Sequence, residues 1–203
     1  MDLRSFGQRP YIIAAPIAFA IFFVGVCLGA AIDPSWLITR HNLSDLGTGK
    51  RTLACAILFD YACCAAGFLI SVFGVGKYIF EEKLNKASGV FFIIGGFGLF
   101  MVGIWNAEWL TLHNISAGFF GIAMAIAIVL SSISDILKKN RLVLVSGILI
   151  LAFLAICWPL FGNAIAESIS IGCATVWFLI QLHKYWKNGQ LGPVTPAADC
   201  IAE

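Results

Sequence analysis

DPSWLITRHNLSDLGTGKRT, residues 33–52, is the only long polar interval among the otherwise apolar blocks of this chain. It carries His41, Ser44 and Asp45, and an apolar run lies on each side of it. Because a hydrocarbon core about 30 Å thick is crossed by about 20 apolar residues of helix, both runs are predicted to be transmembrane helices. The interval between them is therefore predicted to be an extramembrane loop.

The composition of the whole chain is that of a protein embedded in lipid. Of its 203 residues, 60% are hydrophobic and 12% are charged, whereas soluble globular domains contain about 25% charged residues. The polar intervals are too short to form a separate soluble domain, so one membrane domain is predicted over residues 1–187. The net charge of +2 gives no general attraction to nucleic acid, and membrane lipids are the expected surroundings.

The apolar blocks predict an all-α fold, a polytopic membrane protein built as a bundle of six transmembrane helices. The predicted spans are residues 11–31, 52–76, 87–105, 115–137, 142–161 and 164–182. The first run is longer than the apolar core of a signal peptide, about 7 to 15 residues, so it is predicted to stay as a helix. The charged segment 77–86 is predicted to be a loop. Residues 188–203, with two prolines, are predicted to be a disordered cytoplasmic tail.

The distribution of Lys and Arg predicts the orientation of the chain. Ten of the thirteen lie on the side shared by the N-terminus, segment 77–86, the turn after residue 137 and the C-terminal end. The three on the other side are Arg40, Lys50 and Arg51. Because positive residues collect on the cytoplasmic side, both termini are predicted to be cytoplasmic, in a multi-pass protein of the cell membrane.

Three titratable side chains are predicted to meet at the outer mouth of the bundle. Asp45 lies in the first loop, His113 begins the fourth span and Glu167 begins the sixth. Such groups at the start of a span are expected to have partners. These three are the predicted catalytic residues, with His113 as base or ligand and the carboxylates orienting it. A zinc-type metal is left open, as is a structural role for Glu167, whose charge suits a helix start.

Four further residues are predicted to bind the ligand of this site, namely His41, Ser44, Asp60 and Glu108. His41 and Glu108 could instead be polar because they touch water and headgroups. Ser44 could cap the turn before the second span. Each of these three residues therefore has both a binding and a structural interpretation.

Asp60 is the most unusual of the candidates, because it stands eight residues into the second span. At about 1.5 Å per residue this is about 12 Å below the outer end, near the bilayer centre. A bare carboxylate is costly there, so Asp60 should be protonated, paired or facing an internal cavity. A proton or cation site and a neutral packing residue are both left open.

The arrangement resembles the uncharacterised membrane family called domain of unknown function 998. The residues that carry the resemblance are Asn42, Ser44, Asp45, Leu46, Gly47, Phe59, Asp60, His113, Gly162, Glu167 and Trp177. The resemblance covers about residues 10–187 and implies a six-span helical protein, frequent in archaea, in which Asp45, His113 and Glu167 belong together. Where the family tends to have Asn after the Phe, this chain has Asp60, and no activity is established for the family.

Three functions are compatible with these residues. The first is a membrane-embedded module that binds or processes a lipid or its headgroup at the outer site, whether or not it is an enzyme. The second is a small proton-coupled transporter that uses Asp60, although no inverted repeat relates the two halves. The third is a membrane scaffold or assembly partner, acting as a homo-oligomer or through another membrane protein. The sequence names no cofactor, and its 7 cysteines include no C-x-x-C pair.

Overall fold

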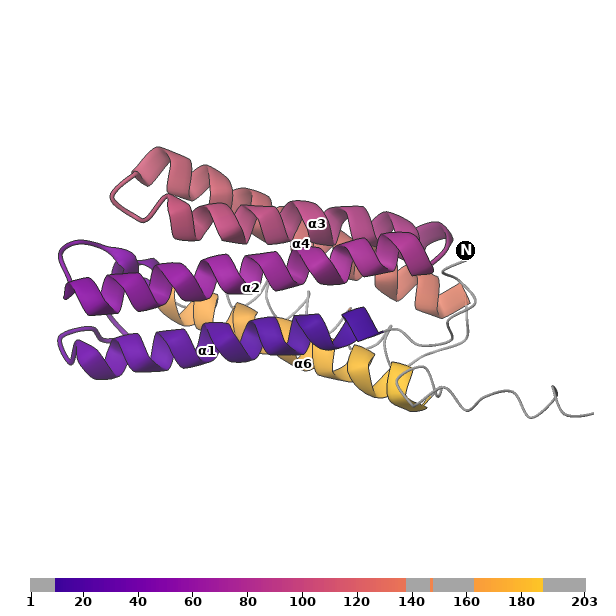
Figure 1. The fold of residues 1–203 in the computed structure, drawn as a ribbon, viewed down its shortest axis with the longest axis horizontal. Helices are drawn as coiled ribbons and strands as arrows, with labels where there is room; N and C mark the ends of the chain where they lie inside the picture. The colour runs from indigo at the N-terminus through magenta and orange to yellow at the C-terminus, as the bar shows by residue number, and fades with distance from the viewer. Residues whose placement is uncertain (1–9, 138–146, 148–162, 188–203) are drawn as a thin grey trace, which may run out of the picture.

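The computed structural model describes residues 10–137, residue 147 and residues 163–187, and the elements in these ranges are all helices (Figure 1). The long helices are α1 (Ala14–Ile32), α2 (Leu53–Phe80), α3 (Lys83–Ile104), α4 (Leu110–Leu137) and α6 (Asn163–Lys187). Two short 3-10 helices, η2 (Pro10–Ile13) and η3 (Leu43–Gly47), lie before α1 and within the loop that follows it. The prediction of an all-α fold is confirmed.

Five helices in the described part of the chain are long and apolar enough to cross a membrane. These segments are Tyr11–Ile32, Leu53–Phe80, Lys83–Ile104, Leu110–Asp135 and Ile165–Lys187. They overlap five of the six predicted spans, whereas the predicted span 142–161, apart from Gly147, and the predicted tail 188–203 lie outside the described residues. The orientation of the termini and the single domain over residues 1–187 stay predictions.

The link between α2 and α3 is much shorter than the loop predicted over residues 77–86. α2 continues to Phe80 and α3 begins at Lys83, so Glu81 and Glu82 alone connect them. The N–H of Glu81 donates to the carbonyl oxygen of Lys77 at 2.9 Å, and Lys83 adopts a φ of 49°. An α-helix pairs its own backbone groups, so it need not end where the apolar residues end.

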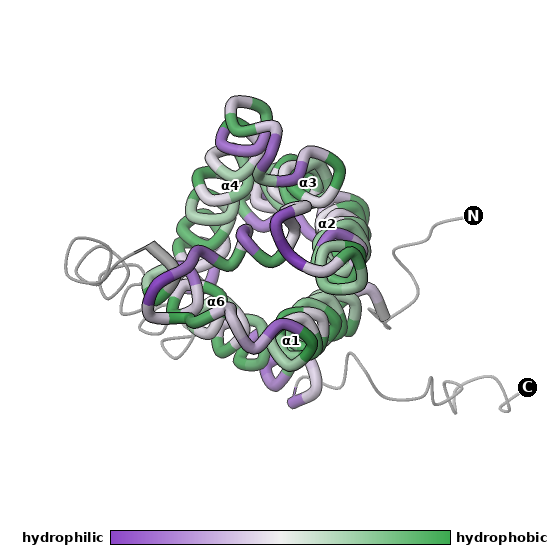
Figure 2. Tube along the Cα trace, turned by 90° about the vertical axis from the view of Figure 1, so that its left-hand side faces the viewer, coloured by the Kyte–Doolittle hydropathy of each residue, from purple (hydrophilic) through white to green (hydrophobic). Residues whose placement is uncertain are grey.

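The first four long helices pack in chain order, α1 on α2, α2 on α3 and α3 on α4, and α6 contacts α1 (Figure 2). Small residues allow the closest approaches. A Cβ atom on Gly67 of α2 would lie 2.5 Å from the carbonyl oxygen of Gly96 in α3, and one on Gly25 of α1 would overlap Ala62 of α2. The helix backbones therefore touch directly, as small residues permit in membrane bundles.

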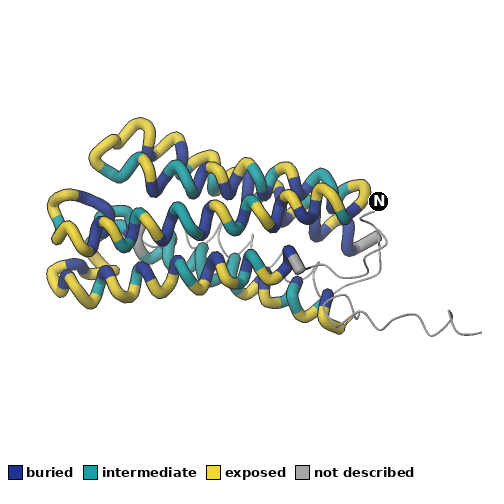
Figure 3. Tube along the Cα trace, in the orientation of Figure 1, coloured by how far each residue is buried: buried dark blue, intermediate teal, exposed yellow. Residues whose placement is uncertain are grey.

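The outward faces of the helices are apolar, as expected for contact with lipid. Leu53, Phe68 and Ile122 are exposed by 75%, 61% and 66%. Figure 3 shows buried positions (dark blue) recurring along α1, α2 and α3, between exposed ones (yellow). Aromatic rings fill part of the interior, where those of Phe73 in α2 and Phe178 in α6 lie 5.2 Å apart, centroid to centroid.

Candidate functional site

The loop between α1 and α2 folds back onto the end of the bundle. Leu46 is fully buried, and its carbonyl oxygen lies 3.4 Å from the thiol sulfur of Cys55 in α2. The same thiol is 3.5 Å from the carbonyl oxygen of Gly29 in α1. Trp36 donates its Nε1–H to the carbonyl oxygen of Asn42 at 2.9 Å. The loop therefore folds as a cap on this end of the bundle, and this end is called the loop end below.

Local hydrogen bonds define η3 within this cap. The backbone N–H of Asn42, the N-cap of η3, donates to Asp45 Oδ2 at 2.9 Å. The hydroxyl of Thr48 donates to the carbonyl oxygen of Asp45, also at 2.9 Å. An acidic residue three positions after a capping Asn suits this arrangement, because it accepts the backbone N–H of the cap. Asp45 therefore has a structural role in the loop.

Four carboxylates at the loop end each accept a backbone N–H of the loop. The pairs are Asp33 with Ser35 at 3.0 Å, Asp45 with Asn42 at 2.9 Å, Glu108 with Gly49 at 2.7 Å and Glu167 with Leu43 at 3.0 Å. Hydrogen bonds to an ionised acceptor are stronger than those between neutral groups. Glu108, just before α4, and Glu167, in the first turns of α6, thereby fasten two helix starts to the loop.

Asp45 and Glu167 lie together, because they bind the adjacent amides of Asn42 and Leu43. Their carboxylates are close enough to interact electrostatically. The other oxygens, Asp45 Oδ1 and Glu167 Oε1, accept no hydrogen bond from the described residues. This pair can therefore still receive hydrogen bonds from a ligand.

His113 lies in the first turn of α4. Its Nδ1 atom is 2.8 Å from the carbonyl oxygen of Trp105, and the residue is exposed by only 6%. Since a carbonyl can only accept, this hydrogen bond puts a proton on Nδ1 and leaves Nε2 as the acceptor of a neutral ring. Within the described ranges no hydrogen bond or ion pair joins His113 to Asp45 or Glu167, and no three His, Cys, Asp or Glu side chains are placed to hold a metal ion.

His41 and Ser44, both predicted as binding residues, differ in their contacts. His41 Nδ1 accepts the backbone N–H of Leu37 at 2.9 Å, which closes a turn of the loop. The hydroxyl of Ser44 makes no hydrogen bond with the part of the chain that the structure describes, and Ser44 is half-buried. Ser44 is therefore available to a ligand, whereas one nitrogen of His41 is engaged.

Asp60 faces the underside of η3. A Cβ atom on Gly47 would lie 2.5 Å from Asp60 Oδ1 and 2.9 Å from the ring of Phe59, so only glycine allows the loop to approach this closely. Asp60 Oδ1 is buried and accepts no hydrogen bond from the described residues. Glu108 is close enough to repel its charge. The loop thus extends as far as Asp60. Asp60 therefore lies nearer to the loop than expected from its position eight residues into the second predicted span.

A second polar group, which sequence reasoning missed, lies at the opposite end of the bundle. This buried polar cluster consists of Lys77, Asn85, Ser88, Ser131, Ser132, Asp135, Trp177, Gln181 and Lys184, and all except the half-buried Lys184 are buried. Its two lysines had an obvious interpretation as cytoplasmic surface charges. The sequence feature that could have indicated this cluster is the presence of two polar residues, Asp135 and Gln181, at the ends of apolar runs.

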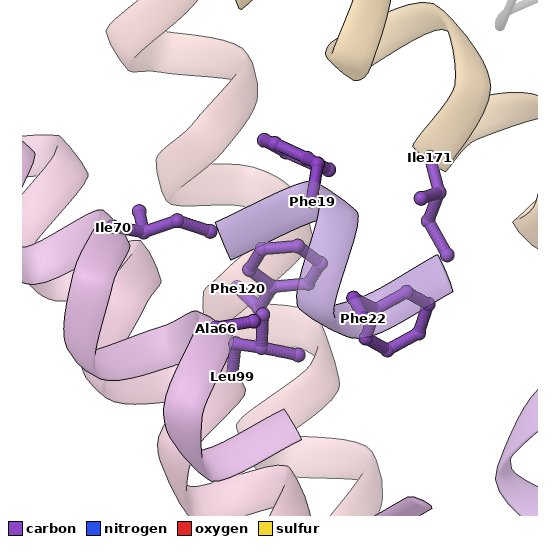
Figure 4. Close-up of a pocket in the computed structure, with 7 residues that line it drawn as sticks. All are labelled: Phe19, Phe22, Ala66, Ile70, Leu99, Phe120 and Ile171. Atoms are coloured by element: carbon purple, nitrogen blue, oxygen red, sulfur yellow. The ribbon is translucent and has the colours of Figure 1, made fainter. Parts of the chain in front are cut away.

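An apolar cavity of about 20 Å³ lies about halfway along the helices, between the two polar ends. Its lining residues are Phe19, Phe22, Ala66, Ile70, Leu99, Phe120 and Ile171 (Figure 4). A small cavity with apolar walls offers water no hydrogen-bond partner. This cavity therefore suits neither a polar ligand nor a chain of water molecules.

Comparisons with known proteins give one family. No curated protein and no solved structure matches this chain. The model of the family described as protein of unknown function (DUF998) matches residues 16–183, a range that includes the loop, Asp60, His113 and Glu167. The chain therefore belongs to the DUF998 family of proteins of unknown function.

Proposed function

We propose that this protein is a small membrane carrier in which Asp60 binds and releases a proton during transport. The observation that supports this proposal is that Asp60 Oδ1 is buried with no hydrogen-bond donor among the described residues. The other acids at the loop end each accept a backbone N–H, namely Asp33, Asp45, Glu108 and Glu167. Asp60 differs from these four because the loop donates no hydrogen bond to it.

The surroundings of Asp60 suit proton exchange better than a fixed ion pair. Its carboxylate lies against Gly47 of the loop, which also packs on the ring of Phe59, and the nearby charge of Glu108 repels it. A bare carboxylate costs more to bury than a neutral carboxyl, and protonation adds an O–H donor. Proton uptake by Asp60 would therefore change how the loop packs above it.

A flux assay in liposomes that enclose a pH-sensitive dye tests the proposal. Under an imposed pH gradient, liposomes with wild-type protein are expected to carry protons faster than empty liposomes. Asp60→Asn keeps the size of the side chain and removes its proton site, so flux is expected to fall to the background. Glu82→Gln is the matched control, because Glu82 is exposed and its side chain makes no capping hydrogen bond. Equal flux through Asp60→Asn and wild type would refute the proposal.

The pair formed by Asp45 and Glu167 supports a second function, the binding of a lipid headgroup that carries an amine. Asp45 Oδ1 and Glu167 Oε1 are both free to accept hydrogen bonds from an ammonium group. If the bound lipid is processed, His113 Nε2 is the candidate base. A bound headgroup would therefore contact the free oxygens of the pair rather than the oxygens that hold the loop.

Native mass spectrometry with phosphatidylethanolamine and phosphatidylglycerol tests this second function. Wild-type protein is expected to prefer the amine-bearing lipid. The double variant Asp45→Asn with Glu167→Gln keeps the shape of both side chains and is expected to lose the preference. An unchanged preference in the double variant would exclude this pair as the headgroup site.

A further inference from the structure

Side chains from four helices meet in the buried polar cluster. The ammonium group of Lys77 donates to Asn85 Oδ1 at 3.2 Å and to Ser131 Oγ at 2.8 Å, which joins α2, α3 and α4. Lys184 Nζ of α6 lies 2.6 Å from Asp135 Oδ1 of α4. Lys77 is exposed by 1% and Asp135 by 0%. Because charge is costly to bury within a membrane bundle, such a cluster indicates a function beyond packing.

Five side-chain atoms of the cluster are buried without a hydrogen-bond partner. They are Asn85 Nδ2, Ser132 Oγ, Asp135 Oδ2, Trp177 Nε1 and Gln181 Nε2. In the described part of the chain, Asp60 Oδ1 alone shares this condition with them. Buried polar atoms are nearly always paired, so a concentration of unpaired ones points to a bound group that completes them.

The lysines fix the direction of two of these donors. An ammonium group can only donate, so Asn85 must turn Oδ1 toward Lys77, and Gln181 must turn Oε1 toward Lys184 at 3.4 Å. The NH₂ groups of both amides are therefore left as free donors. An exchange of oxygen and nitrogen in either amide would break its bond to the lysine.

Two further donors meet at Gly147. A Cβ atom on Gly147 would overlap Ser132 Oγ and would lie 3.5 Å from Trp177 Nε1. The cluster thus offers three N–H groups and a hydroxyl as donors, beside one carboxylate oxygen, Asp135 Oδ2, which can only accept. A ligand that completes this set needs several acceptor oxygens and one O–H.

We propose that the buried polar cluster binds a phosphate group that retains a hydroxyl, as inorganic phosphate or as a phosphate monoester. The phosphate oxygens accept from the free N–H donors beside the positive charge of Lys77, and the hydroxyl donates to Asp135 Oδ2. Sulfate has the same shape but carries no proton to donate near neutral pH, so Asp135 excludes it by repulsion. This proposal does not depend on proton transfer at Asp60.

Thermal unfolding of the full chain in detergent tests the proposal, with phosphate or sulfate at equal pH and ionic strength. Phosphate is expected to raise the Tm of the wild type and sulfate is not. Gln181→Met removes one free N–H group at similar volume, together with the oxygen that accepts from Lys184, and is expected to weaken phosphate binding about tenfold. Asn114→Met, at an exposed amide on α4, is the matched control and should leave phosphate binding unchanged.

A second arm identifies the source of the phosphate, with phosphatidylcholine vesicles that contain phosphatidic acid, a monoester, or phosphatidylglycerol, a diester. Binding of inorganic phosphate supports a soluble ligand, and binding of phosphatidic acid alone supports a lipid. Stabilisation by sulfate as large as that by phosphate, equal binding of both lipids, or no binding of either phosphate source would overturn the proposal. The comparison of phosphate with sulfate uses the wild type, so it stands even if Gln181→Met fails to fold.

Discussion

The side chain of Glu167 accepts a hydrogen bond from the backbone N–H of Leu43 at 3.0 Å, across 124 positions of sequence. The bond joins the first turns of α6 to η3, which caps the bundle between α1 and α2. A hydrogen bond to a charged acceptor contributes about 1.5 to 3 kcal/mol. The position of α6 is thereby coupled to the fold of the loop.

Removal of this acceptor is expected to destabilise the protein. Glu167→Ala should lower the free energy of unfolding by about 1.5 to 3 kcal/mol, because the N–H of Leu43 loses its partner. Glu167→Gln keeps a carbonyl oxygen and should lose less. Reversible unfolding in mixed micelles measures both, with the exposed Glu82→Ala as a control expected to stay within about 0.5 kcal/mol of wild type. A loss for Glu167→Ala no larger than that of the control would show that the bond does not hold the loop.

The ion pair at the start of the loop predicts a dependence on pH. The hydrogen bonds from Ser35 and the charge of Arg51 hold the pKa of Asp33 below its usual value, although desolvation acts in the other direction. Asp33 therefore stabilises the fold above the pKa of the unfolded chain, and this contribution is lost as the pH falls through the lower folded-state value. The difference in Tm between wild type and Asp33→Asn should be largest near neutral pH and shrink in acid. A difference that stays constant across the titration would contradict this role.

Hydropathy predicted the helices of the described chain better than it predicted their ends. Apolar runs long enough to cross lipid are visible in the sequence alone, and five of them are helices. The extension of α2 beyond Gly76 could not be predicted from them, because it begins with a charged residue, Lys77. That lysine is buried against Asn85 and Ser131, which are 8 and 54 positions away in the sequence.

The candidate site could be predicted from the sequence only in part. Asp45 stood out as an acid of the first loop and Glu167 as an acid at the start of a span, and they bind adjacent amides. The partners of the polar side chains, however, are largely backbone groups, such as the N–H of Leu43 and the carbonyl oxygen of Trp105 beside His113. Every residue has such groups, so a sequence cannot show which of them a side chain will reach.

Two glycines form a matched pair for testing helix packing. A Cβ on Gly67 of α2 would press on the backbones of Phe100 and Gly96 in α3, so Gly67→Ala should separate the helices and lower stability by about 1 to 3 kcal/mol. A Cβ on Gly118 of α4 meets no described atom within 4 Å. Gly118→Ala should therefore raise stability, by up to about 1 kcal/mol, through helix propensity. Unfolding of the two variants side by side tests the packing, and the reverse order would contradict it.

Cysteine labelling tests the predicted orientation, which rests on the count of Lys and Arg. Lys50 and Lys83 are both exposed and lie at opposite ends of the bundle, in the loop before α2 and at the start of α3. With both termini in the cytoplasm, Lys50→Cys should react with a membrane-impermeant maleimide in intact cells, whereas Lys83→Cys should react only after permeabilisation. Wild-type protein gives the background from its native cysteines. The reverse pattern would place both termini outside the cell, and with them the buried polar cluster.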